Sequence, residues 1–256
     1  MNTAPRDVLV KFLDGLLSIN AIPSDASNNG LQIEGADKVS KIIFGVDACM
    51  GLFRYAERVK AQFVFVHHGL SWGDELKRIQ GINANRLSIL FKNGMSVYAA
   101  HLPLDCHPQI SHNVLIADSL KLNEKSVFAK YAGADIGVRG ILPVPVTASE
   151  ISKQLNRTLK TKSKIYGDSK REIRKVAIIA GSAGTNSIIE SARQKIDCFI
   201  TGEINHTAYH VIEECGVTVI SAGHYATETP GVIAVMKKVS ENFGLKCEFL
   251  SIPTGM

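Results

Sequence analysis

The sequence predicts an α/β protein built from two similar lobes with mostly parallel, mixed sheets. First, β-branched apolar runs alternate with amphipathic segments, which is the pattern of βαβ units. Second, residues 41–69 match residues 175–203 with one gap, and this internal repeat predicts two related lobes. Third, residues of metal-ligand type follow the strand ends in both halves. A dinuclear metal site in the cleft between the lobes is therefore expected.

The first half reads as one helix and a βαβ unit that continues into a further helix, strand and helix. Residues 1–19 predict an amphipathic helix with Pro5 near its start, and the Ser- and Asn-rich residues 21–35 predict a loop. After it we predict a strand at 41–48, a helix at 49–61 and a strand at 62–66 that ends at a His pair. A loop into a helix that stops at Gly94 follows over 67–94, and then a strand at 95–100 and a helix capped by Ser111 at 111–122.

The second half repeats this order after a short strand at 137–143. Thr147 or Ser149 is expected to cap the next helix, with Glu150 completing the cap. The later strands and helices alternate over 171–181, 185–196, 197–203, 207–215, 216–221, 228–244 and 246–252. We predict a first lobe of residues 1–127 completed by 221–256, and a second lobe of residues 128–220.

Composition indicates an ordinary cytoplasmic globular protein. The chain has 256 residues, of which 45% are hydrophobic and 21% charged. No stretch approaches the roughly 18 to 20 unbroken apolar residues of a membrane helix, and the N-terminus does not resemble a secretory signal. The five cysteines are scattered and form no C-x-x-C pair, so reduced thiols are expected.

Positive charge is concentrated in residues 157–175. This basic segment holds eight Lys or Arg and two acidic residues, so its own charge is +6. The remaining residues sum to −1, which gives the chain its net charge of +5. Such a patch can attract phosphate or nucleic acid. Only Tyr166 could serve there as a stacking platform, which favours a solvated loop and helix face over a nucleic-acid site.

Five residues form the predicted metal-ligand set. His67 and His68 end one strand, and two strands are each followed by a histidine with an acid four residues later. The repeat aligns His101 with His224 and Asp105 with Glu228, and it places Gly202 and Glu203 where the first lobe has its histidine pair. The metals should therefore lie nearer the first lobe. The predicted ligands are His67, His68, Asp105, His224 and Glu228.

Imidazole and carboxylate ligands suit zinc, iron, manganese or a similar divalent metal, and the lack of clustered thiolates argues against a purely structural zinc site. Neighbouring strand residues point to opposite faces, so His67 and His68 are expected to serve different ions, bridged by Asp105. Two ions roughly 3.5 to 4 Å apart can activate water and polarise a substrate oxygen, which is hydrolytic chemistry. His101 and His206 are candidate proton donors.

Other polar residues have simpler interpretations. His206 and His210 stand four residues apart and would share a helix face. They could contact the substrate, support the ligands or form an exposed pair. They do not match the zincin pattern of a helix-borne protease site. His107 and His112 are interpreted as structural, and Cys106 as a small packed side chain. The glycine-rich turn at 181–187 could hold a phosphate but lacks a P-loop ending, so a plain turn is equally compatible.

Five motifs together resemble a known family. They are SNNGLQIEG, FVHHGLSW, HLPLDCHPQISHN, TGEINH and SAGHYATETPG. In this order they resemble the NGG-one-interacting-factor-three-like family, also catalogued as GTP cyclohydrolase one type two. The resemblance implies a two-domain α/β protein, a toroidal homohexamer, and a dinuclear site formed by the five ligands given above. It also implies hydrolytic opening of a guanine ring. Cys106 stands where the family pattern has a small residue such as Ala.

Two functions follow as hypotheses. The first is a cytoplasmic divalent-metal hydrolase with two ions per chain, acting on a nucleotide-like or other small phosphorylated substrate. The second is a non-catalytic metal-binding ring protein that acts through protein or nucleic-acid partners by way of the basic segment. Neither hypothesis involves a membrane.

Overall fold

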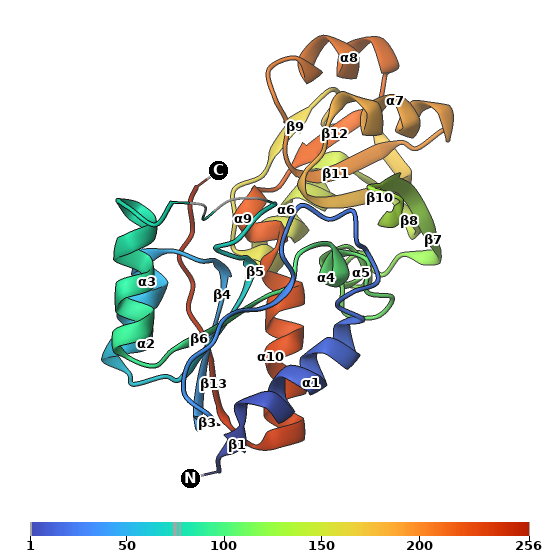
Figure 1. The fold of residues 1–256 in the computed structure, drawn as a ribbon. Coiled ribbons are helices and arrows are strands. Elements are labelled where there is room, and N and C mark those ends of the chain that lie inside the picture. The colour runs from blue at the N-terminus through green and yellow to red at the C-terminus, as the bar shows by residue number, and fades with distance from the viewer. Residues whose placement is uncertain (1, 74–75, 77, 256) are drawn as a thin grey trace. The chain divides into compact units, whose positions relative to one another are not determined.

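The computed structural model describes residues 2–73, 76 and 78–255. It divides the chain into two compact units, each drawn from separate stretches of sequence (Figure 1). Unit 1 comprises Met1–His107 and Gly231–Ile252, and unit 2 comprises Pro108–Pro230 and Pro253–Met256. The fold is α/β with mixed sheets, as predicted.

Unit 1 contains a five-stranded sheet in the order β13-β4-β5-β6-β2. Strands β13, β4, β5 and β6 are parallel, and β2 pairs antiparallel with β6 at the edge. The strands are β2 Gly30–Ile33, β4 Lys41–Asp47, β5 Phe63–His68, β6 Ser96–Ala99 and β13 Lys246–Phe249, and a small antiparallel pair joins β1 Ala4–Pro5 to β3 Lys38–Val39. The unbroken apolar runs of β4 and β5 are those of strands buried on both faces.

Helices cover both faces of this sheet. On one face, α2 (Met50–Arg58) and α3 (Ile82–Lys92) pack in a core with alternate strand residues such as Ile43 and Val64. On α1 (Arg6–Leu17), Asp14 accepts a 2.8 Å hydrogen bond from the hydroxyl of the buried Tyr98. Helix α10 (Thr229–Phe243) packs against α1 through an edge-to-face ring contact at 5.3 Å.

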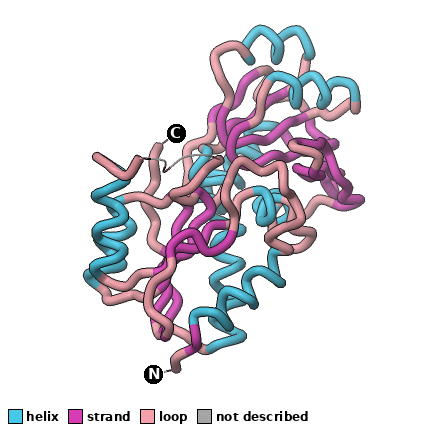
Figure 2. Tube along the Cα trace, viewed as in Figure 1, coloured by secondary structure: helices cyan, strands magenta, loops and turns pink. Residues whose placement is uncertain are grey.

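Unit 2 contains a six-stranded sheet in the order β7-β8-β10-β11-β12-β9 (Figure 2). Its strands are β7 Asn123–Tyr131, β8 Ala134–Thr147, β9 Lys164–Tyr166, β10 Glu172–Ser182, β11 Cys198–Glu203 and β12 Thr218–Ser221. One face packs against α5 (His112–Ser119) and α6 (Ala148–Leu159), and the other packs against α7 (Thr185–Arg193) and α8 (Ala208–Cys215).

The two sheets share a strand order, in agreement with the repeat in the sequence. The run β4-β5-β6-β2 of unit 1 corresponds to β10-β11-β12-β9 of unit 2, with three parallel strands and one antiparallel edge strand in each. Short helices follow the equivalent strands β6 and β12, namely α4 (Leu102–Asp105) and α9 (His224–Thr227). Each places a histidine and an acid four residues apart on one helical turn.

The unit boundaries fall at 107/108 and 230/231, whereas the sequence placed the lobe boundaries at 127/128 and 220/221. Burial explains the first difference, because Ile116, Ala117 and Leu120 of the α5 region belong to the core of unit 2. The assignment of independent domains remains a prediction.

Several local expectations are confirmed, and several strands were missed. Ser111 caps α5 by accepting from the backbone N of Val114, and Thr147 and Glu150 form a reciprocal capping box on α6. The loop expected at 21–35 includes β2, the strand expected at 137–143 is part of the longer β8, and β7 and β9 were not predicted. The loop-to-helix transition expected within 67–94 includes residues 74, 75 and 77, which lie outside the described residues.

Among the residues that the structure describes, no helix combines the length and apolar character needed to cross a bilayer.

Candidate metal centre

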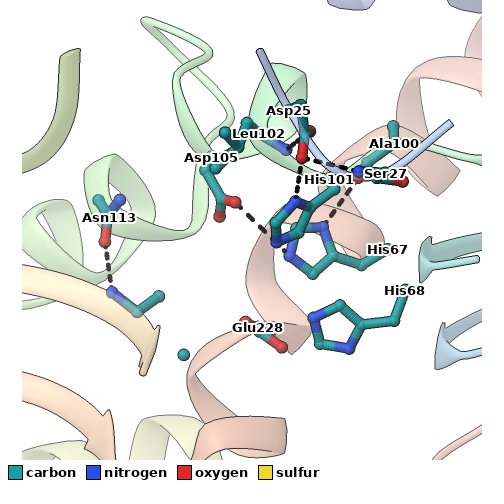
Figure 3. Close-up of polar contacts among 12 residues, drawn as sticks. Asp25, Ser27, His67, His68, Ala100, His101, Leu102, Asp105, Asn113 and Glu228 are labelled. Atoms are coloured by element: carbon teal, nitrogen blue, oxygen red, sulfur yellow. Dashed lines mark hydrogen bonds and ion pairs between the residues drawn. The ribbon is translucent and has the colours of Figure 1, made fainter. Parts of the chain in front are cut away.

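His67 and His68 form the carboxyl end of β5, and an oxygen acceptor fixes one ring nitrogen of each. Nδ1 of the fully buried His67 lies 2.8 Å from the carbonyl oxygen of Ala100 (Figure 3). Nδ1 of His68 lies 2.8 Å from Oδ1 of Asp47. A carbonyl oxygen cannot donate, so Nδ1 of His67 carries the proton. The lone pair of that neutral ring is then on Nε2, the nitrogen able to bind a metal.

His101 follows β6 and is held in the same way. Its Nδ1 lies 2.8 Å from Oδ1 of Asp25, whose side chain is 2% exposed. The ring centroid of His101 lies 5.1 Å from that of His67 and 5.7 Å from that of His68. All three histidines thus place Nδ1 against an oxygen acceptor, the arrangement typical of metal-ligating histidines.

The three imidazoles form a compact donor set. One ring nitrogen from each of His67, His68 and His101 lies within 4.8 Å of the others. The ring centroids of His67 and His68 are only 4.7 Å apart, although both residues belong to β5; their assignment to two different ions stays a prediction. This oriented cluster of imidazoles fits a divalent transition metal.

Asp105 adds a carboxylate to this donor set. It ends α4 and is 8% exposed, and its Oδ2 lies 3.6 Å from Nε2 of His67 (Figure 3). A carboxylate oxygen and an imidazole lone pair at this separation repel each other unless a proton or cation accompanies them. The pair therefore has the donor chemistry of a metal site.

Unit 2 contains the second predicted pair, His224 and Glu228. Nε2 of His224 lies 3.1 Å from Oε1 of Glu228, and Nδ1 lies 3.1 Å from Oε1 of Glu203. Metal–ligand bonds of roughly 2.0 to 2.2 Å place neighbouring ligand atoms about 3 Å apart. The spacing of His224 and Glu228 therefore fits two ligands of one ion, and Glu203 stands in the supporting position.

The charge state of His224 follows from these contacts. The hydrogen bond to Glu228 raises the pKa of His224 to about 9, with a further contribution from Glu203, although partial burial opposes the shift. Without a metal, the imidazolium neutralises one of the two carboxylates. A bound cation would take over that role, because the metal and the proton compete for the same nitrogen.

Two glycines make room for the ligands of unit 2. Gly181 has a φ of +69°, and a Cβ built there would lie 2.3 Å from Oε1 of Glu228. A Cβ at Gly202 would lie 2.3 Å from the carbonyl oxygen of Gly181 and 2.7 Å from Cα of His224. Gly181 is the penultimate residue of β10, and α7 begins at Thr185, so most of the glycine-rich turn predicted at 181–187 belongs to these two elements. Nothing in the described contacts requires a phosphate there.

Three residues around the histidine cluster escaped sequence reasoning. Asp25 and Asp47 orient His101 and His68, and Trp72 places its ring 5.0 Å from His101 and 6.1 Å from His68. The indole N–H of Trp72 donates to the carbonyl oxygen of Gly69 at 3.0 Å. The available signal for Asp47 was its place at the end of β4, beside His68 in the strand register.

The remaining histidines have different surroundings. His206 and His210 are exposed, and α8 begins only at Ala208, so they do not share a helix face as expected. His210 instead makes an edge-to-face contact with Tyr209 at 5.4 Å. His107 is partly buried, and burial lowers its pKa despite a backbone hydrogen bond with Leu16. His112 is buried at the start of α5, and its interpretation as structural stays a prediction.

Comparison with known proteins explains this combination of fold and ligands. The family model Duf34/NIF3 (NGG1p interacting factor 3) matches residues 5–255. The chain belongs to this family. The predicted resemblance is therefore confirmed over nearly the whole chain.

Curated relatives and solved structures of this family cover the chain end to end. The "GTP cyclohydrolase 1 type 2 homolog" of Pyrococcus abyssi is 42% identical, over 98% of this chain and 99% of that protein. The protein of the same name from Archaeoglobus fulgidus is 39% identical over 97% and 98%. Protein ybgI, a solved structure described as of unknown function, is 33% identical with a TM-score of 0.91, over 99% of this chain and 100% of that chain.

Proposed function

We propose that this Duf34/NIF3 chain is a cytoplasmic divalent-metal hydrolase with a dinuclear centre. Its metal ligands are His67, His68, Asp105, His224 and Glu228, and its two ions per chain are zinc, iron, manganese or similar. The chain assembles as a homohexameric ring, which we infer from the family resemblance. The substrate is a nucleotide-like or other small phosphorylated molecule.

The orientation of the histidine rings carries this proposal. His67, His68 and His101 each place Nδ1 2.8 Å from an oxygen acceptor. One ring nitrogen of each also lies within 4.8 Å of the others. A cluster serving only packing or solubility would not require that all three rings have Nδ1 held by an oxygen acceptor. The buried carboxylate of Asp105 beside His67 adds the negative charge that a divalent ion requires.

The protein's own residues supply binding, charge and proton transfer. Bound divalent ions would lower the pKa of a water and polarise a substrate oxygen. Asp105, with oxygens on a buried helix end, is the ligand suited to bridge two ions. His101, whose Nε2 would first take up a proton and then pass it on, is the candidate proton donor inside the cluster, and the exposed His206, in the turn before α8, is the candidate at the surface.

The substrate class is inferred from the relatives. Those cited above carry the name GTP cyclohydrolase 1 type 2 homolog, which denotes hydrolysis of a guanine nucleotide. The proposed chemistry is compatible with that name, because water activated between cations can attack a ring carbon or a phosphoryl group. We therefore place guanine nucleotides first among the candidate substrates.

Metal analysis of the purified chain tests the proposal directly. We expect at least one transition-metal ion per chain, and hydrolysis of a nucleotide that chelation abolishes and one particular metal restores. Asp105→Ala should lose metal and activity together, whereas the matched control His210→Ala, at an exposed histidine, should lose neither. Less than one ion per chain, with no effect of Asp105→Ala on metal content or hydrolysis, would refute the proposal.

The alternative is a metal-binding ring that acts through protein or nucleic-acid partners. Its support is the basic segment 157–175, whose lysines and arginines are largely exposed. Some of this charge is already engaged, since Arg171 lies 3.6 Å from Asp197 and Arg174 donates to the carbonyl oxygen of Pro143 at 2.7 Å. Salt-sensitive binding of polyanions without any chelator-sensitive hydrolysis would favour this alternative.

A further inference from the structure

Asp25 lies in the loop before β2 and is saturated with hydrogen bonds. Oδ1 accepts from the backbone N of Ser27 at 3.0 Å and lies 2.8 Å from Nδ1 of His101. Oδ2 accepts from Nδ2 of Asn29 at 2.8 Å and from the backbone N of Leu102 at 2.9 Å. Each oxygen thus has two partners, and the side chain is 2% exposed. Asp25 is therefore poorly placed to be a metal ligand.

These contacts hold Asp25 as a carboxylate. Burial by itself disfavours the charge, but the hydrogen bonds from His101, Asn29 and Ser27 outweigh it and lower the pKa of Asp25 to about 2. An amide could not replace it, because either orientation of an Asn at this position would turn its NH₂ group towards two donors. A buried, permanent acceptor is thus built at Nδ1 of His101.

The same loop also holds the backbone of His101. Oδ1 of Asn29 accepts from the backbone N of His101 at 2.8 Å, while Nδ2 of Asn29 donates to Asp25. His101 is thus fixed at its main chain and at its ring by residues more than 70 positions earlier in the sequence. No packing requirement explains this, since the ring of His101 is partly exposed and lies outside the apolar cores described above.

We propose that Asp25 is a positioning residue of the metal centre: it keeps the proton of His101 on Nδ1 and directs Nε2 towards His67 and His68. Residues 25–29, which the sequence predicted only as part of a loop, thereby have a function. This role rests on the proposed metal centre, but the contact between Asp25 and His101 can be tested without any metal.

The first experiment reads the tautomer of His101 in metal-free protein. Proton–nitrogen NMR of ¹⁵N-labelled chain at about pH 8, above the ordinary histidine pKa of about 6.5, distinguishes protonated from bare ring nitrogens. We expect a protonated Nδ1 and a bare Nε2 for His101. Asp25→Ala should shift His101 towards the other tautomer or a mixture, while Asp14→Ala, which removes the partner of Tyr98 in the same unit, should leave it unchanged.

The second experiment measures metal affinity in the same proteins. Asp25→Ala should weaken binding of Zn²⁺ or Mn²⁺ by roughly 10- to 100-fold, the usual effect of losing a supporting oxygen partner in a metal site, because a reoriented His101 would disturb the cluster it forms with His67 and His68. Asp25→Asn should behave similarly, because it cannot satisfy all four donors. If Asp25→Ala does not fold, Asn29→Ala replaces it. This variant keeps the carboxylate of Asp25 but removes one of its donors and the acceptor for the backbone N of His101. We expect smaller changes in tautomer and in metal affinity, in the same direction.

Two results would overturn the positioning role. One is a folded Asp25→Ala protein in which both the tautomer of His101 and the metal affinity are unchanged. The other applies where Asp25→Ala does not fold, and is an Asn29→Ala protein in which both are unchanged. A wild-type chain that binds none of the metals would instead refute the proposed function. The NMR comparison would still decide whether Asp25 sets the tautomer of His101.

Discussion

Asp47 Oδ1 and His68 Nδ1 lie 2.8 Å apart at the ends of two paired strands, β4 and β5. In unit 2 the residue paired with Glu203 is Ser182, and the carboxylate of Glu203 itself lies 3.1 Å from Nδ1 of His224. Both units therefore contain such an acid–histidine pair, on β4 and β5 in unit 1 but on β11 and after β12 in unit 2. The pair lies one strand further along the repeat in unit 2, because Glu203 stands where unit 1 has its histidine pair and His224 stands where unit 1 has His101.

Removal of Asp47 should weaken metal binding without unfolding the chain. Asp47→Ala deletes the acceptor that fixes His68, so we expect roughly 10- to 100-fold weaker affinity and a smaller loss for Asp47→Asn, which keeps an oxygen. The side chain of Asp47 is 37% exposed, so the thermal midpoint should change little. Calorimetric titration with Zn²⁺ measures the affinity. Asp118→Asn, an exposed carboxylate paired with Lys125, is the control; equal affinities of wild type and Asp47→Ala would contradict the expectation.

Trp72 should report metal binding by fluorescence. It is the only tryptophan of the chain, and its ring centroid lies 5.0 Å from that of His101. An open-shell ion such as Co²⁺ or Cu²⁺ bound to these histidines would quench the indole emission at this short range, whereas closed-shell Zn²⁺ would not quench by that route. We expect saturable quenching that His68→Ala weakens and His210→Ala leaves intact. Emission unaffected by a stoichiometrically bound Co²⁺ would place the ion away from this cluster.

Side chains at Gly181 or Gly202 should damage the ligands of unit 2. Gly181→Ala puts a Cβ 2.3 Å from Glu228 and requires a left-handed conformation costing about 1–2 kcal/mol. Gly202→Ala meets backbone on both sides and should be the more destabilising change. Denaturant melts and metal analysis check both. The control is Gly184→Ala, which should keep its metal content, because a Cβ at residue 184 meets open space and the φ there is an ordinary −79°. A Gly181→Ala protein with normal stability and metal content would exclude the steric role of Gly181.

The two pairs of a histidine and an acid could be found in the sequence because their geometry is local. His101 and Asp105, like His224 and Glu228, stand one helical turn apart after a strand, and such spacing is visible in the chain itself. The repeat was likewise visible in the order of apolar runs. Alternation along β5 could not show how closely the rings of His67 and His68 approach, because it describes the direction of Cβ and does not fix where long side chains end.

The supporting acids could not be predicted, because their partners are distant in the sequence. Asp25 precedes His101 by 76 residues and Asp47 precedes His68 by 21, and no periodicity connects such pairs. The edge strands β7 and β9 were missed for another reason. They are short or largely exposed, so they lack the unbroken apolar pattern that identified the central strands.

Metal-free protein should become less stable as the pH rises from 6.5 to about 9. The pKa of His224 is raised from 6.5 to about 9, chiefly by the hydrogen bond with Glu228. A raised pKa means that the folded state holds the proton more tightly than the unfolded state. The contribution to the free energy of unfolding is therefore complete below pH 6.5 and is lost as the pH passes through about 9.

Denaturant melts of metal-free wild type across this range measure the effect. Glu228→Gln should bring the pKa of His224 back towards 6.5 and remove most of the slope, while Glu203→Gln should remove less, because Glu228 is the larger cause of the shift. NMR titration of the His224 ring supplies the pKa independently of stability. A His224 that titrates near 6.5 in metal-free wild type would show that the carboxylates of Glu203 and Glu228 do not hold its proton.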